Sequence, residues 1–265
     1  MMRENRLRKC INENKPMVST RLWSANPWFT EAAGLTGHFD YIEFVAEYAP
    51  FDFTDLPNIA RAAELNDMGT MIKVDLQNRA YVAQKAIQAG FQSILFVDHC
   101  TAEQVRESVA MIKPKTEGSV GMFGYPQGRY IGGQPDIAIP EHIKRLDEVV
   151  ACFMIEKQQA VDNIEEICKV PGVDMIQFGP SDYCMSRGWV KAEHVEDFKA
   201  AERHCIEVAL ANGVRPRCEI HSPSEAQYYI QLGVKDFSIG DEFVELKNYW
   251  NSAAKEMRSI ADQLV

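Results

Sequence analysis

CxxC motifs and long apolar runs are absent from this sequence of 265 residues, and its first residues do not have the pattern expected of a secretory leader. The cysteines number seven, an odd count, and include no CxxC pair, which predicts reduced thiols in a cytoplasmic protein. No run approaches about 18 apolar residues, so the sequence predicts no membrane span. The cations of the first nine residues have no apolar segment behind them, which argues against a secretory signal.

Basic residues are also scarce. Lys and Arg total 28 against 38 Asp and Glu, giving a formal net charge of −10. This balance argues against a surface for nucleic acid or an anionic membrane, although a local basic pocket for a small anion stays open. The glycines between positions 118 and 133 lack the GK[ST] ending of a P-loop, and no phosphorylatable histidine motif is visible. A phosphate-transferring enzyme is therefore disfavoured.

What the sequence does contain is a regular alternation of short apolar runs and helical segments. Apolar residues make up 46% of the chain, which is typical of a globular protein with a sizeable core. The predicted strands are 17–23, 39–45, 69–75, 93–97, 151–155, 173–178, 214–220 and 234–239. Because no break in composition divides them, we expect one α/β domain over 1–265. A single (β/α)8 TIM barrel is favoured over two doubly wound halves.

Helix starts are marked by capping residues. Asn26 followed by Pro27 predicts an N-cap with proline in the first helical position. Thr101 to Gln104 has the form of a capping box, and Ser222 to Glu225 has the same form. A long helix is expected from about 191 to 212.

The last predicted helix, from about 242 to 264, carries an apolar stripe. Its members are Phe243, Leu246, Trp250, Ala253, Met257, Ile260 and Leu264. Such a stripe either closes the helix onto its own barrel or packs it on a neighbouring subunit.

A glycine-rich segment from 114 to 137 interrupts the alternation. A long loop of this composition inside a compact domain is usually functional or disordered. Arg129 lies in it, and we expect a solvated loop arginine there, with contact to an anionic substrate tail as the alternative.

Two acids stand out because each follows an apolar run. Glu156 directly follows 151–155, and Asp182 closes the sequence Gly179-Pro-Ser-Asp182 after 173–178. The carboxyl ends of barrel strands meet at one rim, where such barrels keep their chemistry. Two carboxylates without His or Cys suit a hard divalent ion with open water positions, Mg²⁺ or Mn²⁺. The alternative is a pair of helix N-cap or loop acids.

Together these stretches resemble the HpcH/HpaI aldolase family, the metal-dependent class II pyruvate aldolases of the phosphoenolpyruvate/pyruvate barrel superfamily. The resemblance extends over nearly the whole chain, from Leu22 to Asp241. Its most specific parts are Ile155-Glu156, Pro171-Gly-Val-Asp174, Gly179-Pro-Ser-Asp182, Phe39-Asp-Tyr41 and Glu47-x-Ala-Pro50-x-Asp52.

The resemblance implies that Glu156 and Asp182 hold Mg²⁺ or Mn²⁺, which would bind the carboxylate and keto oxygen of pyruvate. The ion would act as a Lewis acid for the enolate left when the C–C bond breaks. Backbone N–H groups of Ser181 and Asp182 would face the substrate carboxylate, since Pro180 has none. The implied substrate-binding residues are Trp23, Gly179, Pro180 and Ser181. The implied assembly exchanges the terminal helix between subunits, in trimers paired into hexamers.

Several positions depart from the family pattern, so the chain is a divergent member. Val45 and Tyr48 stand where the family has an Asp and the catalytic His that moves the proton. Lys73 stands where the family has the substrate-gripping Arg, or Val74 does if the alignment shifts by one residue. Lysine would keep the charge but lose the bidentate fork. Met154 replaces a Gln. A phenol with a reference pKa of about 10 is a poor base, so Tyr48 is expected to act as an acid or to bond a metal-bound water.

His99, just past the fourth predicted strand, is a second candidate for the proton transfer. Its alternative is a rim histidine bonded to a loop carbonyl. Cys100 and Cys184 flank the same rim, and we interpret them as bystanders.

The sequence thus predicts a divalent-metal-dependent aldolase, a C–C lyase that cleaves a 2-oxo acid to pyruvate or a related oxo-acid plus an aldehyde. The predicted catalytic residues are Lys73, Tyr48 and His99. A metal-dependent oxo-acid decarboxylase or isomerase is the alternative within enzymes. A catalytically inactive barrel that binds a metabolite is the alternative from another class. The expected partners are the small-molecule substrates and further copies of the chain.

Overall fold

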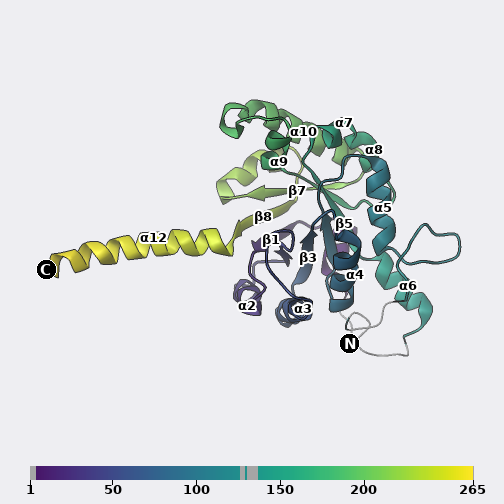
Figure 1. The fold of residues 1–265 in the computed structure, drawn as a ribbon, viewed down its shortest axis with the longest axis horizontal. Helices are drawn as coiled ribbons and strands as arrows, with labels where there is room; N and C mark the ends of the chain where they lie inside the picture. The colour runs from purple at the N-terminus through teal and green to yellow at the C-terminus, as the bar shows by residue number, and fades with distance from the viewer. Residues whose placement is uncertain (1–3, 126–128, 130–136, 265) are drawn as a thin grey trace.

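Eight parallel strands form a closed barrel in chain order (Figure 1). The computed structural model describes residues 4–125, 129 and 137–264. The strands are β1 (Met17–Leu22), β2 (Tyr41–Phe44), β3 (Gly69–Val74), β4 (Ser93–Phe96), β5 (Val150–Ile155), β6 (Met175–Phe178), β7 (Arg215–Ile220) and β8 (Asp236–Asp241). Pairing of β8 with β1 closes the barrel, with a register shift between Ser19 and Arg21. The predicted (β/α)8 fold is confirmed, and each predicted strand coincides with an observed one to within a few residues.

Helices follow the strands and cover the outside of the barrel. They are α2 (Pro27–Leu35), α3 (Asp55–Leu65), α4 (Arg79–Ala89), α5 (Ala102–Ile112), α6 (Ile139–Asp147), α7 (Gln158–Asp162), α8 (Ile164–Cys168), α9 (Pro180–Ser186), α10 (Val195–Ala211) and α11 (Ala226–Gln231). Short 3₁₀ turns cover Lys191–Glu193, Pro223–Glu225 and Asp262–Leu264. The predicted long helix therefore divides into a 3₁₀ turn and α10.

Two of the three predicted helix caps are confirmed. The Asn26 side chain accepts from the Trp28 N–H at 3.1 Å, and Thr101 and Gln104 form both bonds of the capping box. At Ser222 the predicted proline in the first position and the N-cap are observed, but the capping box does not form. Its hydroxyl accepts from the Ser224 N–H, while the Glu225 N–H bonds the Ser222 carbonyl at 3.0 Å, so a 3₁₀ turn forms instead of a boxed α-helix start.

A short helix that the sequence did not predict, α1 (Arg6–Asn12), covers the N-terminal end of the barrel. Leu7 and Cys10 pack among the interior side chains. Arg8 anchors the helix through an ion pair with Asp174 at 2.6 Å. Seven residues are too few to show helical periodicity, so burial at the barrel end is what stabilises this element.

The barrel interior holds buried charge as well as apolar side chains. Arg217 on β7 has no exposed side-chain surface, and it bonds Glu43 on β2 and Gln177 on β6. Nearer the C-terminal rim, Arg21 pairs with Glu219 at 2.7 Å and Asp241 at 3.1 Å. Each buried cation therefore has an acid beside it, as burial of charge requires.

Helix α12 (Glu242–Ala261) leaves the barrel as an extended arm (Figure 1). None of its residues is buried, and Phe243 and Trp250 are each more than 60% exposed. The predicted stripe therefore does not close onto its own barrel. The arm is fixed at its root by Glu242, whose Oε1 accepts from the N–H groups of Trp23 and Ser24, each at 2.6 Å. In the described ranges, no helix is both long and apolar enough to cross a membrane.

Much of the predicted glycine-rich segment lies outside the described residues, at 126–128 and 130–136. Arg129 is described, and its guanidinium pairs with Glu64 and donates to the Ala89 carbonyl at 3.3 Å. These partners lie where α3 and α4 lead into their next strands, at the end of the barrel opposite the carboxyl ends of the strands. Both interpretations of Arg129, a solvated arginine and a substrate contact, are therefore wrong.

Candidate active site

The carboxyl ends of the strands bring most of the predicted site residues to one rim. Glu156 follows β5, Asp182 lies in the first turn of α9, and Lys73 is the next-to-last residue of β3. Tyr48 and Trp23 follow β2 and β1, and their rings stack with centroids 5.4 Å apart. The parallel topology alone gathers these side chains, because every strand ends at the same face.

Glu156 is a buried carboxylate whose negative charge is stabilised by few neighbouring groups. It is 2% exposed, and its Oε1 accepts from the Asp98 N–H at 2.8 Å. Its Oε2 has no hydrogen bond or ion pair with the described part of the chain. Burial raises the pKa of Glu156 to about 7, and the nearby charges of Asp182 and Asp98 add to this, against the opposing effect of Lys73. A cation bound at this carboxylate would stabilise its charged form and lower its pKa.

Two charged residues at the rim were missed by the sequence interpretation. Lys157 directly follows Glu156, and its Nζ lies 2.8 Å from Asp98 Oδ1 and 3.9 Å from Asp182 Oδ1. Asp98 has a positive φ of 62°, a conformation that few residues other than glycine adopt. The signal was available, since Asp98 comes straight after the predicted strand 93–97 and Lys157 is the neighbour of Glu156.

Gly179, which follows β6, allows the backbone to lie close to Glu156, the candidate metal ligand. A Cβ on this residue would lie 2.8 Å from Glu156 Cβ and 2.9 Å from Glu156 Oε2. Only a residue without a side chain fits there, so the glycine sets the position of Glu156.

We expect Gly179→Ala to reduce divalent-metal affinity at least about tenfold, because the added methyl displaces the Glu156 carboxylate. Mn²⁺ titration followed by EPR would measure this. Gly213→Ala is unsuitable as a control because of its positive φ, whereas Gly124→Ala meets no atom within 4 Å and has no such backbone constraint. Unchanged Mn²⁺ affinity in Gly179→Ala would show that the close approach is irrelevant.

Lys73 lies between an acid and a phenol. It is 8% exposed, its Nζ is 2.5 Å from Glu47 Oε2, and it donates to Tyr48 Oη at 3.2 Å. Burial opposes the charge on Lys73, but Glu47 outweighs it, so the net effect is a raised lysine pKa. Burial raises the pKa of Tyr48, with Lys73 opposing. At neutral pH the lysine is therefore cationic and the phenol is neutral.

The structure does not bring His99 to the rim. His99 is 1% exposed, and its ring lies between the barrel and α5, with its plane at 77° to that of Phe153. Nδ1 contacts the Val97 carbonyl and Nε2 contacts Ser108 Oγ, each at 2.6 Å. Burial lowers the pKa of His99 to about 4. Both ring nitrogens are occupied inside the protein, so the expectation that His99 transfers the substrate proton is dropped.

His99 should instead make the fold acid-sensitive. Its folded pKa lies below the ordinary value of 6.5, so its stabilising contribution is present above pH 6.5 and is lost as pH falls towards 4. Between pH 7 and 5 the loss is about 2 kcal/mol. The test is the free energy of unfolding in urea, measured at about pH 7 and pH 5. Between these values it should fall by about 2 kcal/mol less in His99→Gln than in the wild type. Equal losses in both proteins would contradict a depressed His99 pKa.

The turn that carries Asp182 begins with Pro180 at the first position of α9. The backbone N–H groups of Ser181 and Asp182 follow, and first-turn N–H groups have no carbonyl within their own helix. The Ser181 hydroxyl accepts from Lys191 Nζ at 3.1 Å. The substrate contacts assigned to Gly179, Pro180, Ser181 and Trp23 stay predictions.

The donor set at the rim fits a hard divalent ion. Among the described residues, no group of three or more His, Cys, Asp and Glu side chains could hold a metal. An ion here would rest on Glu156 and Asp182, with water and substrate oxygens in its other positions, as Mg²⁺ and Mn²⁺ accept. The unbonded Glu156 Oε2 is the observation that supports this fit.

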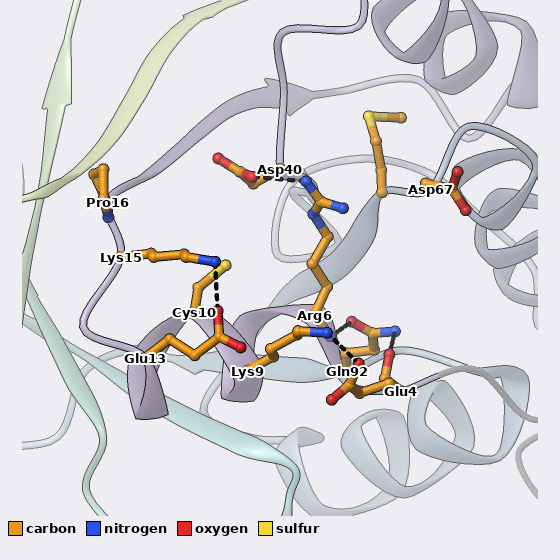
Figure 2. A pocket seen from close by; sticks show the side chains of 11 residues that line it. Glu4, Arg6, Lys9, Cys10, Glu13, Lys15, Pro16, Asp40, Asp67 and Gln92 are labelled. Atoms are coloured by element: carbon orange, nitrogen blue, oxygen red, sulfur yellow. Dashed lines mark hydrogen bonds and ion pairs between the residues drawn. The ribbon is translucent and has the colours of Figure 1, made fainter.

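A second hollow, of about 750 Å³, lies at the opposite end of the barrel beside α1 (Figure 2). It is lined by cations that each face an acid. The pairs are Arg6–Asp40 at 2.9 Å, Lys9–Glu4 at 2.8 Å and Lys15–Glu13 at 2.6 Å. Because their charge is neutralised within the protein, this hollow is not the basic pocket that the sequence left open.

Comparison with known proteins agrees with this architecture. A model of the HpcH/HpaI aldolase/citrate lyase family matches residues 22–237. The 5-keto-4-deoxy-D-glucarate aldolase of Klebsiella pneumoniae is 26% identical over 239 residues, which cover 90% of this chain and 91% of that protein. The hydroxypyruvate/pyruvate aldolase of Roseobacter denitrificans is 27% identical over 257 residues, covering 96% and 97%.

The fold comparison gives the same result. The crystal structure of an HpcH/HpaI aldolase/citrate lyase family protein from Burkholderia cenocepacia has a TM-score of 0.85 at 21% identity, covering 96% of this chain and 100% of that one. The barrel and the matches to aldolases over most of the chain define a lyase of the aldolase type. The chain belongs to the HpcH/HpaI aldolase/citrate lyase family, as the sequence resemblance predicted.

Proposed function

We propose that this aldolase depends on a divalent ion, Mg²⁺ or Mn²⁺, and cleaves a 2-oxo acid to pyruvate or a related oxo-acid plus an aldehyde. The observation that carries the proposal is Glu156, a buried carboxylate with one unbonded oxygen and a raised pKa beside Asp182. The name of the Roseobacter relative, a hydroxypyruvate/pyruvate aldolase, supports the substrate class.

Each residue of the proposed site has its own role around that ion. Glu156 and Asp182 would hold it, and when bound it would supply Lewis-acid stabilisation of the enolate. Lys73 offers a fixed positive charge for the substrate carboxylate or carbonyl. Tyr48, neutral at neutral pH, is placed to donate a proton to the enolate carbon after cleavage. Ser181 and Asp182 present backbone N–H groups to the substrate carboxylate.

The test is retro-aldol cleavage of a simple 4-hydroxy-2-oxo acid by metal-stripped protein, with and without Mn²⁺. We expect pyruvate release only with the ion, measured with lactate dehydrogenase. EPR of bound Mn²⁺ should change when oxalate, a mimic of the pyruvate enolate, is added. Turnover without any divalent ion would overturn the proposal. If oxalate leaves the EPR spectrum unchanged, the proposal that the substrate yields pyruvate is overturned.

One observation favours a second candidate, a metal-dependent oxo-acid decarboxylase. The histidine predicted to move the proton, His99, faces α5 and not the rim. Loss of CO₂ from a 2-oxo diacid gives the same enolate without any hydroxyl proton to remove. Oxaloacetate in the same coupled assay distinguishes the two activities.

We further propose that the chain assembles into trimers or hexamers by packing α12 on a neighbouring copy. At the root of the arm lies an apolar groove of about 920 Å³. It is lined on one side by Trp23, Phe29 and Pro50, and on the other by Phe243 and Trp250. An exposed stripe of this size is typical of a subunit interface.

A cytoplasmic location is the matching proposal for compartment. All seven cysteines are free thiols, and six of them are buried. A chain with this many unpaired thiols suits a reducing environment.

A further inference from the structure

Glu47 is joined to Lys73 by both its side chain and its backbone. The carboxylate lies 2.5 Å from Lys73 Nζ, and the Glu47 N–H donates to the Lys73 carbonyl at 3.1 Å. The second bond fixes the loop after β2 against the end of β3. The acid is therefore held beside the lysine by the barrel backbone, not by chance contact of two long side chains.

The surroundings of Lys73 make this acid necessary. The lysine side chain is 10% exposed and the Glu47 side chain 16% exposed, so little water reaches either charge. Burial of an ammonium to this degree without a counter-charge lowers its pKa and favours the neutral amine. Within the described chain, Glu47 is the one acid that lies within 4.0 Å of Lys73 Nζ.

The lysine also has a free donor for the substrate. Of its three N–H groups, one faces Glu47 and one is donated to Tyr48 Oη. The third has no hydrogen-bond partner among the described residues. Glu156 is close enough for its charge to act on Lys73, so the ammonium lies near the proposed metal site.

We propose that Glu47 is a positioning residue that keeps Lys73 protonated and directed between Tyr48 and the substrate, so that Lys73 acts as a fixed cation. This deepens the proposed function and rests on it. A neutral amine in the same place would be a nucleophile towards a 2-oxo acid. Its nitrogen would bond to the keto carbon and water would leave, giving a Schiff base. By keeping the amine charged, Glu47 prevents Lys73 from forming a Schiff base.

Competitive acetylation of the metal-free protein tests the charge state directly. Trace acetic anhydride reacts only with neutral amines, and peptide mass spectrometry gives the extent at each lysine. We expect Lys73 to stay unlabelled at about pH 8 in the wild type and in Glu47→Asp. In Glu47→Gln its labelling should rise at least about tenfold, the change for one pKa unit. Lys157, whose partner is Asp98, should not change and serves as the internal control.

A second measurement covers the case in which the reagent cannot enter. Borohydride reduction with pyruvate should trap an adduct on Lys73 in Glu47→Gln but not in the wild type or Glu47→Asp. Circular dichroism checks that each variant is folded. If Glu47→Gln shows neither labelling nor trapping above the wild type, the proposal is overturned. Neither measurement requires metal or turnover, so failure of the metal-dependent aldolase proposal would show separately, in the pyruvate-release assay.

Discussion

Glu156→Gln is expected to lower kcat/KM for retro-aldol cleavage at least about 10³-fold and to abolish tight Mn²⁺ binding. The amide keeps the shape of the side chain but removes the charge that, with Asp182, would hold the ion. A Lewis-acid contribution of about 4 kcal/mol corresponds to roughly that factor in rate. Coupled pyruvate release and Mn²⁺ EPR measure the two effects.

The same variant should not destabilise the metal-free protein. Glu156 has a folded pKa of about 7 against an ordinary value of 4.5, so its protonated form is favoured in the fold. Its contribution to stability is full below pH 4.5 and is lost as pH rises through about 7. At pH 8 without metal, Glu156→Gln should therefore unfold at the same urea concentration as the wild type or a higher one.

A matched control separates loss of a ligand from loss of any carboxylate. Glu165 on α8 has an exposed side chain, and its one ion pair in the described part of the chain is with the exposed Lys169. Glu165→Gln should leave turnover, Mn²⁺ binding and stability unchanged, as exposed ion pairs contribute little. Metal-dependent turnover that survives in Glu156→Gln would refute the assigned role of Glu156.

If the chain assembles through α12 as proposed, Trp250→Asp is expected to convert the oligomer to smaller species, down to the monomer. Trp250 is 61% exposed on α12 and lines the groove at the root of the arm. A tryptophan at the centre of an interface commonly contributes about 2–4 kcal/mol, and a symmetric assembly loses that amount at every copy. Light scattering coupled to size exclusion would measure the change in mass.

Ser252→Asp supplies the control, because it adds the same charge two residues away, on the opposite side of the helix. We expect its mass to equal that of the wild type. If Trp250→Asp keeps the full mass while remaining folded, then α12 is not the exchanged element. A wild-type protein that is monomeric at all concentrations would remove the oligomer proposal altogether.

The fold could be predicted because most strands of this parallel barrel, β2 to β6, are buried on both faces. Such strands appear in sequence as continuous apolar runs, and their spacing gives the alternation directly. Glu156 and Asp182 were found for the same reason, since an acid just after an apolar run must emerge at the C-terminal rim. Helix α1 was missed because seven residues carry no periodicity, and its packing partners are far along the chain.

The direction of a side chain was the information that the sequence did not hold. His99 comes three residues after the end of β4, yet its ring turns outward to Ser108 on α5. Glu47 stands in a stretch that the resemblance already marked, but its contact with Lys73 depends on the register of β2 against β3. These outcomes follow from packing between distant elements, which position in the chain cannot specify.

The buried arginine inside the barrel has a consequence for how the protein unfolds. Arg217 and Glu43 are separated by 174 residues in sequence and meet only when β2 and β7 both belong to a closed barrel. A half-formed barrel would leave the guanidinium in an apolar interior without its acid, at a cost of about 3–5 kcal/mol. The free energy of a partly opened barrel is higher by that amount. The barrel therefore closes and the Arg217–Glu43 pair forms in the same step. Amide hydrogens of β2 and β7 should therefore exchange with solvent in one cooperative opening, although they belong to opposite halves of the chain.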